Sequence, residues 1–344
     1  MLGLSGQVAR QISKVLSVFD GSKYTRIPPE SKQNGTRMTP VKNTAAAVKN
    51  TAVNKPKPAV SIIGTGRLGT ALAIALAQEG YSIAALVARR RESARRAAAL
   101  LDVPTRVMAV KELAELPAPE LLIIATPDDQ IAKLAQTLAK LDWDTDRATT
   151  VLHTSGALSA SVLSPLREKN WSTGSLHPLV SVSEPKAGAR LLRGAFWSVE
   201  GDKRAVRLGR SIVRDLDGKS FSVGSENKPL YHAAAVMASG NVTALFDVAI
   251  EMLAECGLTR RQAQSALLPL VASAVRNLEE LDPARALTGT FARGDVETVK
   301  RHLALLKNNP TALEIYRLLG RRSLDLAGSR LDAAVVKRIK RLIR

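Results

Sequence analysis

The chain has 344 residues, enough for two domains of ordinary size, and a net charge of +19 that is concentrated at its ends. Residues 1–58 carry a net charge of +8 and residues 329–344 one of +5, which leaves only +6 for the 270 residues between them. No basic stripe interleaved with aromatic residues accompanies this charge, so we expect solvated extensions rather than a nucleic-acid or membrane surface; contact of the tails with RNA or anionic lipid is the alternative.

The composition points to a helix-rich soluble protein, with 45% hydrophobic but only 3% aromatic residues. The single cysteine, Cys256, excludes a disulfide scaffold and favours a reducing, cytoplasmic compartment. No apolar run approaches the roughly 18 to 20 residues of a membrane span, so no transmembrane segment is expected.

Residues 1–58 begin with a short amphipathic stretch at 8–16 and continue as a polar segment that ends in N-K-P-K-P. This composition is typical of a disordered basic arm. Because its beginning carries Arg and Lys but few acids, a transit peptide is an alternative, and translation starting at Met38 is another.

The segment from residue 60 to residue 77 reads as a strand, a tight turn and a helix. Its turn follows the pattern G-x-G-x-x-G, in which the glycines permit the turn, the close approach of a pyrophosphate and tight packing of helix on strand. The helix N-terminus adds free N–H groups for the phosphates. The sequence therefore predicts a dinucleotide site that includes Gly64, Thr65, Gly66, Arg67, Leu68 and Gly69.

Strand and helix patterns alternate after this turn. The further predicted strands lie at residues 82–87, 105–108, 121–125, 149–152, 175–176, 196–199 and 220–223. This order predicts an α/β fold, a Rossmann-type doubly wound and mostly parallel sheet over residues 59–224, with the strand ends facing one crevice.

The strand signals stop near residue 227. Long helical patterns follow at residues 228–255, 260–281, 296–306 and 312–327. We therefore predict an all-helical domain over residues 225–328, followed by a basic C-terminal helix or tail at residues 329–344.

The end of the second predicted strand decides between the two nicotinamide cofactors. An acid at this point holds the ribose 2′-hydroxyl of NAD, whereas an arginine accommodates the 2′-phosphate of NADP. The chain has Arg89 and Arg90 here and no acid before Glu92, which favours NADP over the alternative of solvated arginines. Thr126 and Pro127, after the fourth predicted strand, would cover the nicotinamide ribose.

Two polar loops follow the fifth and sixth predicted strands, where the nicotinamide ring and a substrate would meet. The first carries His153, Ser155 and Gly156, and the second carries His177. Ser155 could bind a substrate carbonyl or hydroxyl, and His177 could move the proton that accompanies hydride transfer. We expect Ser155 and His177 to be catalytic and the other two to contact the substrate.

The first long predicted helix begins with Lys228 and carries His232 one turn later, so either side chain could be a proton donor. Asn241 lies nine residues after His232, on the opposite side of a straight helix unless Gly240 kinks it. Arg293, in a glycine-bounded loop, could bind an anionic group of the substrate. The alternative for each is a structural role, such as a helix start or cap.

Six motifs carry a family resemblance, at residues 64–69, 153–156, 177–179, 231–234, 287–289 and 293–295. With them the chain resembles the 6-phosphogluconate dehydrogenase-like superfamily of NADP oxidoreductases. More closely, it resembles an uncharacterised bacterial family in which a Rossmann-like domain precedes a helical domain of unknown function. The resemblance covers residues 59–325.

The resemblance implies a fold and a cofactor but no substrate. Prephenate dehydrogenases, which are distant relatives, place a serine and a His-Pro beside the reacting carbon, and by similarity these are Ser155 and His177. Hydroxyacid dehydrogenases use a helix lysine with an asparagine one turn later, whereas here His232 follows Lys228. Family members usually have proline at the position of Thr290. Related enzymes dimerise through the helical domain, so a homodimer is expected.

Together these observations favour an NADP-dependent oxidoreductase. It would transfer hydride between NADP(H) and a small, anionic carbonyl, imine or hydroxy compound at the crevice between the domains, with no metal. The alternative from another class is a non-catalytic NADP-binding sensor or scaffold module.

Overall fold

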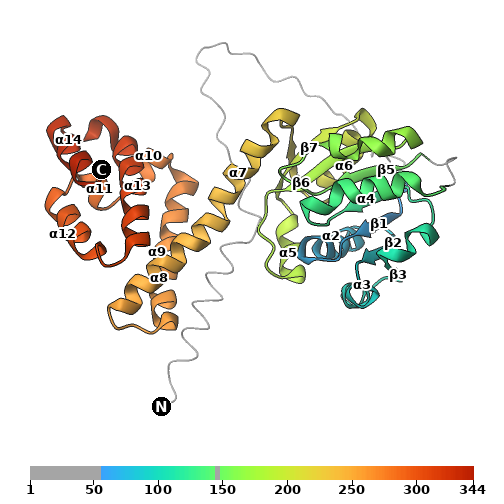
Figure 1. Ribbon diagram of the computed structural model, residues 1–344, viewed down its shortest axis with the longest axis horizontal. Helices are drawn as coiled ribbons and strands as arrows, with labels where there is room; N and C mark the ends of the chain where they lie inside the picture. The colour runs from blue at the N-terminus through green and yellow to red at the C-terminus, as the bar shows by residue number, and fades with distance from the viewer. Residues whose placement is uncertain (1–55, 144–147) are drawn as a thin grey trace, which may run out of the picture. The chain divides into compact units, whose positions relative to one another are not determined.

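The computed structural model describes residues 56–143 and 148–344, which fall into two compact units (Figure 1). Unit 1 ends at Ala235 and unit 2 comprises Val236–Arg344. The expected boundary at residues 224 and 225 differs from this one, because the helix that begins at Lys228 is anchored to the sheet by hydrogen bonds of that lysine. The predicted arm lies outside the described residues except for residues 56–58.

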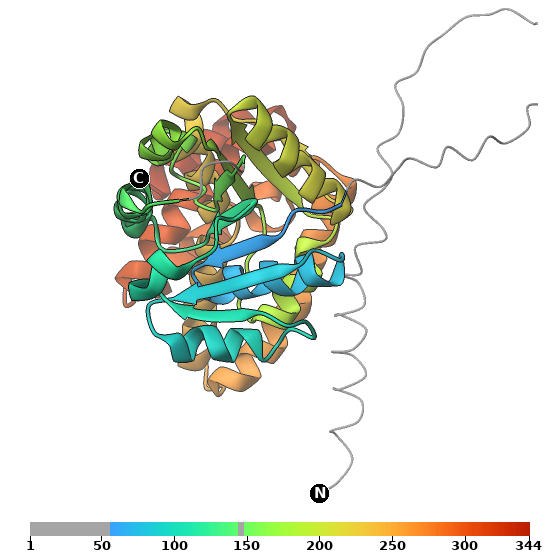
Figure 2. The ribbon, with the colours of Figure 1, turned by 90° about the vertical axis from the view of Figure 1, so that its right-hand side faces the viewer.

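Unit 1 is built on one eight-stranded sheet, and its strands β1 and β2 lie side by side in Figure 2. The strand order is β3-β2-β1-β4-β5-β6-β7-β8. The strand bounds are β1 Val60–Ile63, β2 Ile83–Ala88, β3 Arg106–Ala109, β4 Leu121–Ile124, β5 Thr150–His153, β6 Ser172–Pro178, β7 Phe196–Gly201 and β8 Lys219–Phe221. The predicted Rossmann-type fold class is thereby confirmed.

One part of the sheet prediction was wrong. Strand β7 pairs antiparallel with β6, and β8 runs parallel to β7, so these two strands do not end at the edge where the others end. A short connection through one helix returns the chain from β6 to β7, which places the start of β7 beside the end of β6. In this register Ser198 lies opposite His177.

The sheet is covered on both faces because side chains alternate along each strand. The helices of unit 1 are α2 Arg67–Gln78, α3 Arg91–Ala98, η2 Val110–Glu115, α4 Asp128–Lys140, η3 Ala160–Lys169, α5 Pro185–Leu192, α6 Lys203–Asp215, η4 Ser225–Asn227 and α7 Lys228–Ala238, whose last residues continue into unit 2. Ile62 of β1 and Ile123 of β4 belong to the core with α2, α3, α5 and α6, whereas Ile63 and Ile124 belong to the core with α4 and η3.

Helix α5 was not predicted, although its start signal is in the sequence. The carboxylate of Glu184 accepts hydrogen bonds from the backbone N–H groups of Lys186 (3.0 Å) and Ala187 (2.7 Å), and Pro185 occupies the first helical position. The helix packs closely on α2: a Cβ at Gly188 would lie 3.2 Å from the Cβ of Ala71.

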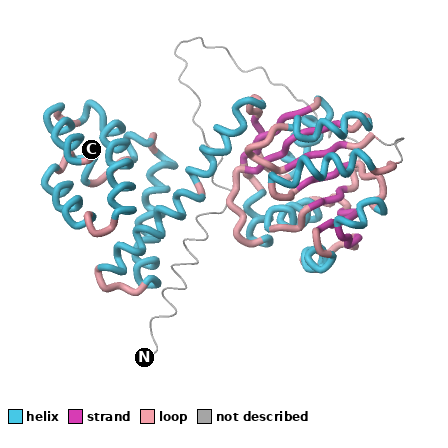
Figure 3. The backbone as a smooth tube through the Cα atoms, viewed as in Figure 1, coloured by secondary structure: helices cyan, strands magenta, loops and turns pink. Residues whose placement is uncertain are grey.

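Unit 2 is wholly helical in the part that the structure describes (Figure 3). Its helices are α8 Gly240–Glu255, α9 Arg260–Glu280, α10 Pro283–Ala286, α11 Thr290–Arg293, α12 Val296–Leu306, α13 Pro310–Ala327, η5 Gly328–Arg330 and α14 Ala333–Leu342. The predicted helix over residues 228–255 is divided at Ser239, immediately before Gly240. Residues 329–344 are part of the packed unit rather than a tail, since Ile339 and Ile343 are buried in its core.

The helical run Ser225–Glu255 corrects the expectation that no segment approaches a membrane span. Its most apolar window has a mean hydropathy of 1.5 and is only 6% buried, so by length and composition it could cross a membrane. Core helices of soluble proteins can have the same length and composition. Lys228 near its start is fully buried within unit 1.

Candidate functional site

The glycine turn after β1 has the geometry of a phosphate-binding loop. Gly64 has φ +105°, and a Cβ there would lie 2.5 Å from the carbonyl oxygen of Ala125; a Cβ at Gly69 would lie 1.9 Å from that of Gly64. Both positions therefore require glycine for packing. A Cβ at Gly66, in contrast, would meet no atom within 4 Å, so this residue faces open space.

The N-terminus of α2 is free to bind an anion. Its N-cap residue, Gly66, has no side chain to accept the first N–H groups, and its first turn carries no acid. The two other residues of the motif play different parts: Arg67 is exposed, whereas Leu68 is half-buried against the core.

A cavity of about 800 Å³ adjoins this turn at the ends of β1, β2 and β4. Besides Gly64 and Gly66 it is lined by Arg89, Arg90, Thr126 and Pro127, which the sequence assigned to the cofactor. The hydroxyls of Thr65 and Thr126 are buried and have no hydrogen-bond partner in the described part of the protein. Unpaired polar groups and an open helix N-terminus fit a dinucleotide in this cavity.

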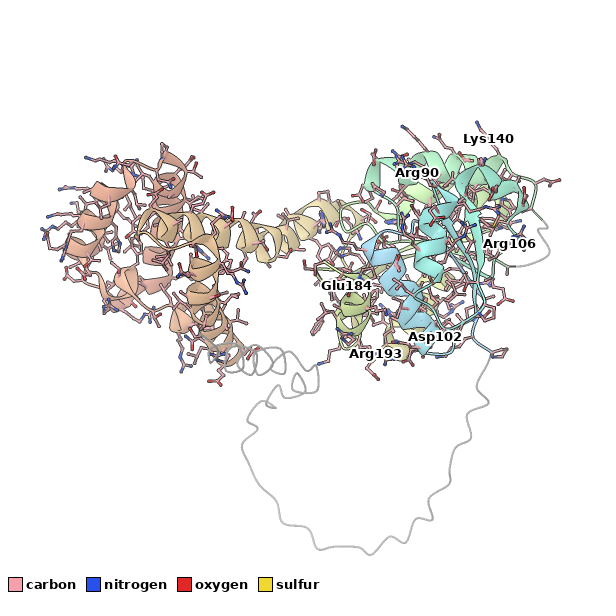
Figure 4. The ribbon with its side chains drawn as sticks, turned by 90° about the horizontal axis from the view of Figure 1, so that it is seen from below. Arg90, Asp102, Arg106, Lys140, Glu184 and Arg193 are labelled. Atoms are coloured by element: carbon pink, nitrogen blue, oxygen red, sulfur yellow. The ribbon has the colours of Figure 1, made fainter. Side chains whose placement is uncertain are left out.

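The arginines after β2 differ in their contacts. Arg91 forms an ion pair with Glu112 (2.7 Å), and two arginines further along α3 pair with Glu92. Arg89 and Arg90 line the cavity and have no ion-pair partner among the described residues. Figure 4 shows Arg90 on the side of unit 1 opposite Asp102. The two arginines closest to the strand are therefore the ones available for a ligand.

Ser155, in the loop after β5, uses its hydroxyl to shape that loop. Its Oγ donates to the carboxylate of Asp128 (2.8 Å) and accepts hydrogen bonds from the backbone N–H groups of Ala157 (3.2 Å) and Leu158 (3.0 Å). A hydroxyl has one proton to donate and two lone pairs, so these three contacts occupy it fully. The observed geometry fits a positioning role better than the expected contact with a substrate.

His153 is fully buried, and both of its ring nitrogens are engaged. Nδ1 accepts the backbone N–H of Ser155 (3.2 Å), so the ring proton is on Nε2, which donates to the carbonyl of Ser159 (3.1 Å). Burial, followed by the charge of Lys228, lowers the pKa of His153 to about 4. A neutral imidazole with no free nitrogen holds the loop, and it has no atom left for the expected substrate contact.

Gly156 is in the same loop as Ser155, and three residues from other elements lie around it: His177, Tyr231 and His232. The Nδ1 atom of His177 is 2.7 Å from the phenol oxygen of Tyr231, and the rings of His177 and His232 lie edge to face with centroids 5.8 Å apart. A Cβ at Gly156 would lie 2.7 Å from His177 Nε2 and 2.5 Å from His232 Nδ1. Glycine is required at this position because both imidazoles approach the backbone there.

Lys228, the first residue of α7, is fully buried. Its Nζ donates to the hydroxyl of Ser175 (2.9 Å) and to the carbonyl of Ser155 (3.4 Å), and no carboxylate in the described residues pairs with it. Burial lowers its pKa, against the opposing charges of Glu200 and Asp128. The lysine thus joins α7 to the loops after β5 and β6 and brings the residues of its first turns to the site.

The structure therefore gathers six predicted residues and two neighbours, Asp128 and Tyr231, at the loops after β5 and β6 of unit 1, whereas two predicted residues lie in unit 2. Asn241 and Arg293 are both exposed there; Asp295, next to the latter, caps α12 by accepting the N–H of Thr298 at 3.0 Å. Sequence reasoning assigned no role to Tyr231 and did not link Asp128 to Ser155. The described residues include no group of three or more His, Cys, Asp or Glu that could hold a metal ion.

Two models of protein families match the chain, one after the other. Residues 44–178 match the model of a Rossmann-like domain, and residues 195–323 match that of a domain of unknown function, DUF2520. No curated protein matches the chain in sequence.

Several solved structures are similar to it. A candidate NADP oxidoreductase from Bacteroides fragilis is 25% identical, with a TM-score of 0.65 over 78% of this chain and 98% of that one. A protein from Thermotoga maritima is 23% identical, with a TM-score of 0.61 over 79% and 99%. A pyrroline-5-carboxylate reductase from Coxiella burnetii is 16% identical, with a TM-score of 0.52 over 83% and 99%. The last two likenesses show the fold alone.

Proposed function

Because the chain belongs to the proteins in which a Rossmann-like domain precedes a DUF2520 domain, we propose that it is an NADP-dependent oxidoreductase. It transfers hydride between NADP(H) and a small, anionic carbonyl, imine or hydroxy compound. The likeness to a candidate NADP oxidoreductase supports the proposal. The observation that carries it is the continuity of two sites: Pro127 lines the cavity at the glycine turn, and the next residue, Asp128, bonds the loop that bears Gly156.

The residues that would hold NADP are those of the cavity. The N–H groups at the start of α2 would bind the pyrophosphate, and Arg89 and Arg90 would bind the 2′-phosphate. Thr65 and Thr126 would give their unpaired hydroxyls to the cofactor. When bound, the nicotinamide supplies or accepts the hydride.

His177 would move the proton that balances the hydride. Its Nε2 lies beside Gly156, which is in the loop after β5, and its Nδ1 is hydrogen-bonded to Tyr231. Burial, and next the charge of Lys228, lowers the pKa of His177 to about 4, so the ring is neutral at neutral pH. His232 would complete this site, while Lys228, Ser155 and His153 keep the loops in place.

The proposal is tested by titrating the protein with NADPH and NADH and following cofactor fluorescence. We expect NADPH to bind at least about tenfold more tightly than NADH, and Arg89→Asp to remove this preference, since a charge-assisted phosphate contact is worth about 1.4 kcal/mol or more. Arg96→Asp is the matched control, because Arg96 pairs with Glu92 outside the cavity lining and its loss should leave both affinities unchanged. Absence of binding by either cofactor would refute the proposal.

We also propose that a second copy of the chain covers the apolar faces of α8 and α9. Side chains that are 36% to 65% exposed there are Val242, Leu245, Met252, Leu268, Leu270, Val275 and Leu278. Exposed apolar side chains in this number are typical of an interaction surface, and a second copy would bring an equally apolar one.

Light scattering during gel filtration tests this assembly. Wild type should be a dimer and Leu270→Lys a monomer, whereas Leu305→Lys, at the 76% exposed Leu305 on α12, should remain a dimer. A monomeric wild type would contradict the proposal. Flotation of the wild type with lipid vesicles, in place of dimerisation, would instead assign the apolar run to a membrane.

A further inference from the structure

The His177–Tyr231 contact joins the end of β6 to the first turn of α7. The phenol oxygen lies 2.7 Å from Nδ1, and the rings meet edge on at 88° with centroids 5.5 Å apart. The Nζ atom of Lys228 lies 5.7 Å from the centre of the phenol ring. The His177–Tyr231 pair thus lies between the buried amine of Lys228, beside the phenol, and Gly156, beside the imidazole.

Both partners of this hydrogen bond are neutral near pH 7. Burial raises the pKa of Tyr231 to about 12, so its phenol keeps the proton, and the pKa of His177 is lowered to about 4, so its imidazole is neutral. A phenol O–H is a stronger hydrogen-bond donor than an imidazole N–H, and an imidazole nitrogen is a good acceptor. We therefore infer that Tyr231 donates to Nδ1 and that the proton of His177 is on Nε2.

The second nitrogen of the ring is available to a ligand. A Cβ at Gly156 would lie within 2.7 Å of both His177 Nε2 and His232 Nδ1, so the two atoms approach the same point from different rings. His232 Nδ1 is buried and has no partner among the described residues. One donor and one unpaired nitrogen on neighbouring rings suit a carbonyl or imine group together with the hydroxyl or amine that it becomes.

We propose that Tyr231 is the proton source behind His177 in the reduction, so that the two residues form a relay from the phenol to the substrate. The inference rests on the proposed function, in which a reduced nicotinamide dinucleotide provides the hydride. As the substrate carbon gains the hydride, the electron pair of its double bond moves to oxygen or nitrogen. That atom takes the proton from His177 Nε2, and His177 Nδ1 takes the proton from the phenol. His177 thus stays neutral and Tyr231 becomes a phenolate; the resting state returns when Nε2 takes a proton from water and Nδ1 gives its proton back to the phenolate.

The surroundings favour this direction of transfer. An imidazole that gave up its Nε2 proton without replacement would become an anion, and the phenol proton prevents this. The Lys228 amine beside the ring stabilises a phenolate when it is protonated. An alkoxide or amide formed on the substrate is a much stronger base than a phenolate, so the proton moves toward the substrate. Tyr231 acts through His177 and is a positioning residue, whereas His177 touches the reacting atom.

The tautomer of His177 tests the relay without any substrate. In protein labelled with ¹⁵N histidine, each of the four histidines can be assigned from a His→Gln variant. We expect His177 to carry its proton on Nε2 at pH 7, and Tyr231→Phe to lower the ratio of the Nε2–H to the Nδ1–H form about three- to tenfold, the loss of one hydrogen bond. The titratable groups that face the His177 ring are Lys228, His232 and His153, and both the wild type and Tyr231→Phe retain them.

Tyr316→Phe is the matched control, because Tyr316 makes the same contact with Nδ1 of His302 at 2.8 Å in unit 2. This variant should shift the tautomer of His302 and leave that of His177 unchanged. A proton on Nδ1 of His177 in the wild type would overturn the relay. So would an unchanged His177 ratio in Tyr231→Phe while His302 responds to its own variant.

Activity gives the second readout, with a panel of small 2-oxo acids and cyclic imines under NADPH. Tyr231→Phe should lower kcat about 10- to 100-fold with KM and NADPH affinity within twofold of the wild type, and Tyr316→Phe should change neither. Unchanged kcat in Tyr231→Phe would overturn the relay. Failure of the wild type to bind NADPH would refute the proposed function instead, and the tautomer result would distinguish the two failures.

Discussion

Each unit of the molecule contains a histidine hydrogen-bonded to a tyrosine, and the two contacts have nearly the same distance and ring angle. The Nδ1-to-phenol distances are 2.7 Å for His177–Tyr231 and 2.8 Å for His302–Tyr316, and the ring planes meet at 88° and 85°. In unit 2 the tyrosine also packs on Phe291, with centroids 5.3 Å apart. In unit 1 the pair lies beside Lys228 and among the other histidines of the chain.

The surroundings of the two pairs differ, and we infer that these surroundings, rather than the hydrogen bond itself, decide whether a pair takes part in chemistry. The pair in unit 2 braces α12 against α13, a contact that aromatic packing completes. The pair in unit 1 has the Lys228 amine on one side and, on the other, a second imidazole and a glycine against which both rings pack. We expect substitutions in the first pair to change catalysis and substitutions in the second to change stability.

Replacing each histidine should give the largest contrast. His177→Gln removes the group that transfers the proton, and we expect kcat for NADPH-dependent reduction to fall about 10² to 10⁴-fold, the usual value of general acid catalysis. His302→Gln should leave kcat within twofold. Steady-state kinetics with the panel of oxo acids and imines provides the measurement, and equal losses in both variants would remove the distinction between the pairs.

The space at Gly156 should be almost as important as the histidine. In Gly156→Ala the new methyl group would lie within 2.7 Å of both His177 Nε2 and His232 Nδ1, so at least one ring must move. A displacement of this size costs about 100-fold in rate. NADPH affinity should fall far less than kcat, since the residues that would hold the phosphates line a cavity that does not include Gly156. Gly240→Ala, whose Cβ meets no atom within 4 Å, is the control, and full activity of Gly156→Ala would refute the assigned geometry.

The loop that carries Gly156 should also make the stability of unit 1 depend on pH. The pKa of buried His153 is about 4 in the folded protein, below its ordinary value of about 6.5, so the folded state favours the neutral ring. This contribution is fully present above pH 6.5 and is lost as the pH falls toward 4, by roughly 3 kcal/mol at most. Urea unfolding at pH 7.5 and 4.5 should show a smaller difference for His153→Gln than for wild type; equal differences would contradict the account.

The smallest effect should come from the brace in unit 2. Tyr316→Phe removes one hydrogen bond, that to His302, without changing the packing of the ring, so the free energy of unfolding should fall by about 1 kcal/mol. Thermal or urea unfolding measures it. A loss of several kcal/mol would show that this pair does more than brace two helices.

Local signals in the sequence were enough for the sheet and the cofactor turn. The apolar runs of β1 and β4 are visible because both of their faces are buried, and the glycines are visible because packing requires them at positions 64 and 69. The reversal at β7 carries no such signal. A short strand reads alike in either direction, and only its pairing with β6 determines how it runs.

The sequence identified residues that lie together at the candidate site, but it did not indicate which of them hold the loops and which are open to a ligand. The pattern of loops named His153, Ser155 and His177 together, but it cannot show that backbone N–H groups already occupy Ser155 and His153. Tyr231 was next to a predicted histidine, and its role depends on a contact with a residue 54 positions away, which no local pattern records.

A crystal structure with NADP⁺ bound tests the central claim most directly. We predict the 2′-phosphate on Arg89 or Arg90, the pyrophosphate at the start of α2, and the nicotinamide ring beside Gly156, close enough for a substrate to contact both that ring and His177 Nε2 at about 3 to 3.5 Å. A cofactor that leaves Arg89 and Arg90 in solvent, or whose nicotinamide points away from His177, would contradict the account.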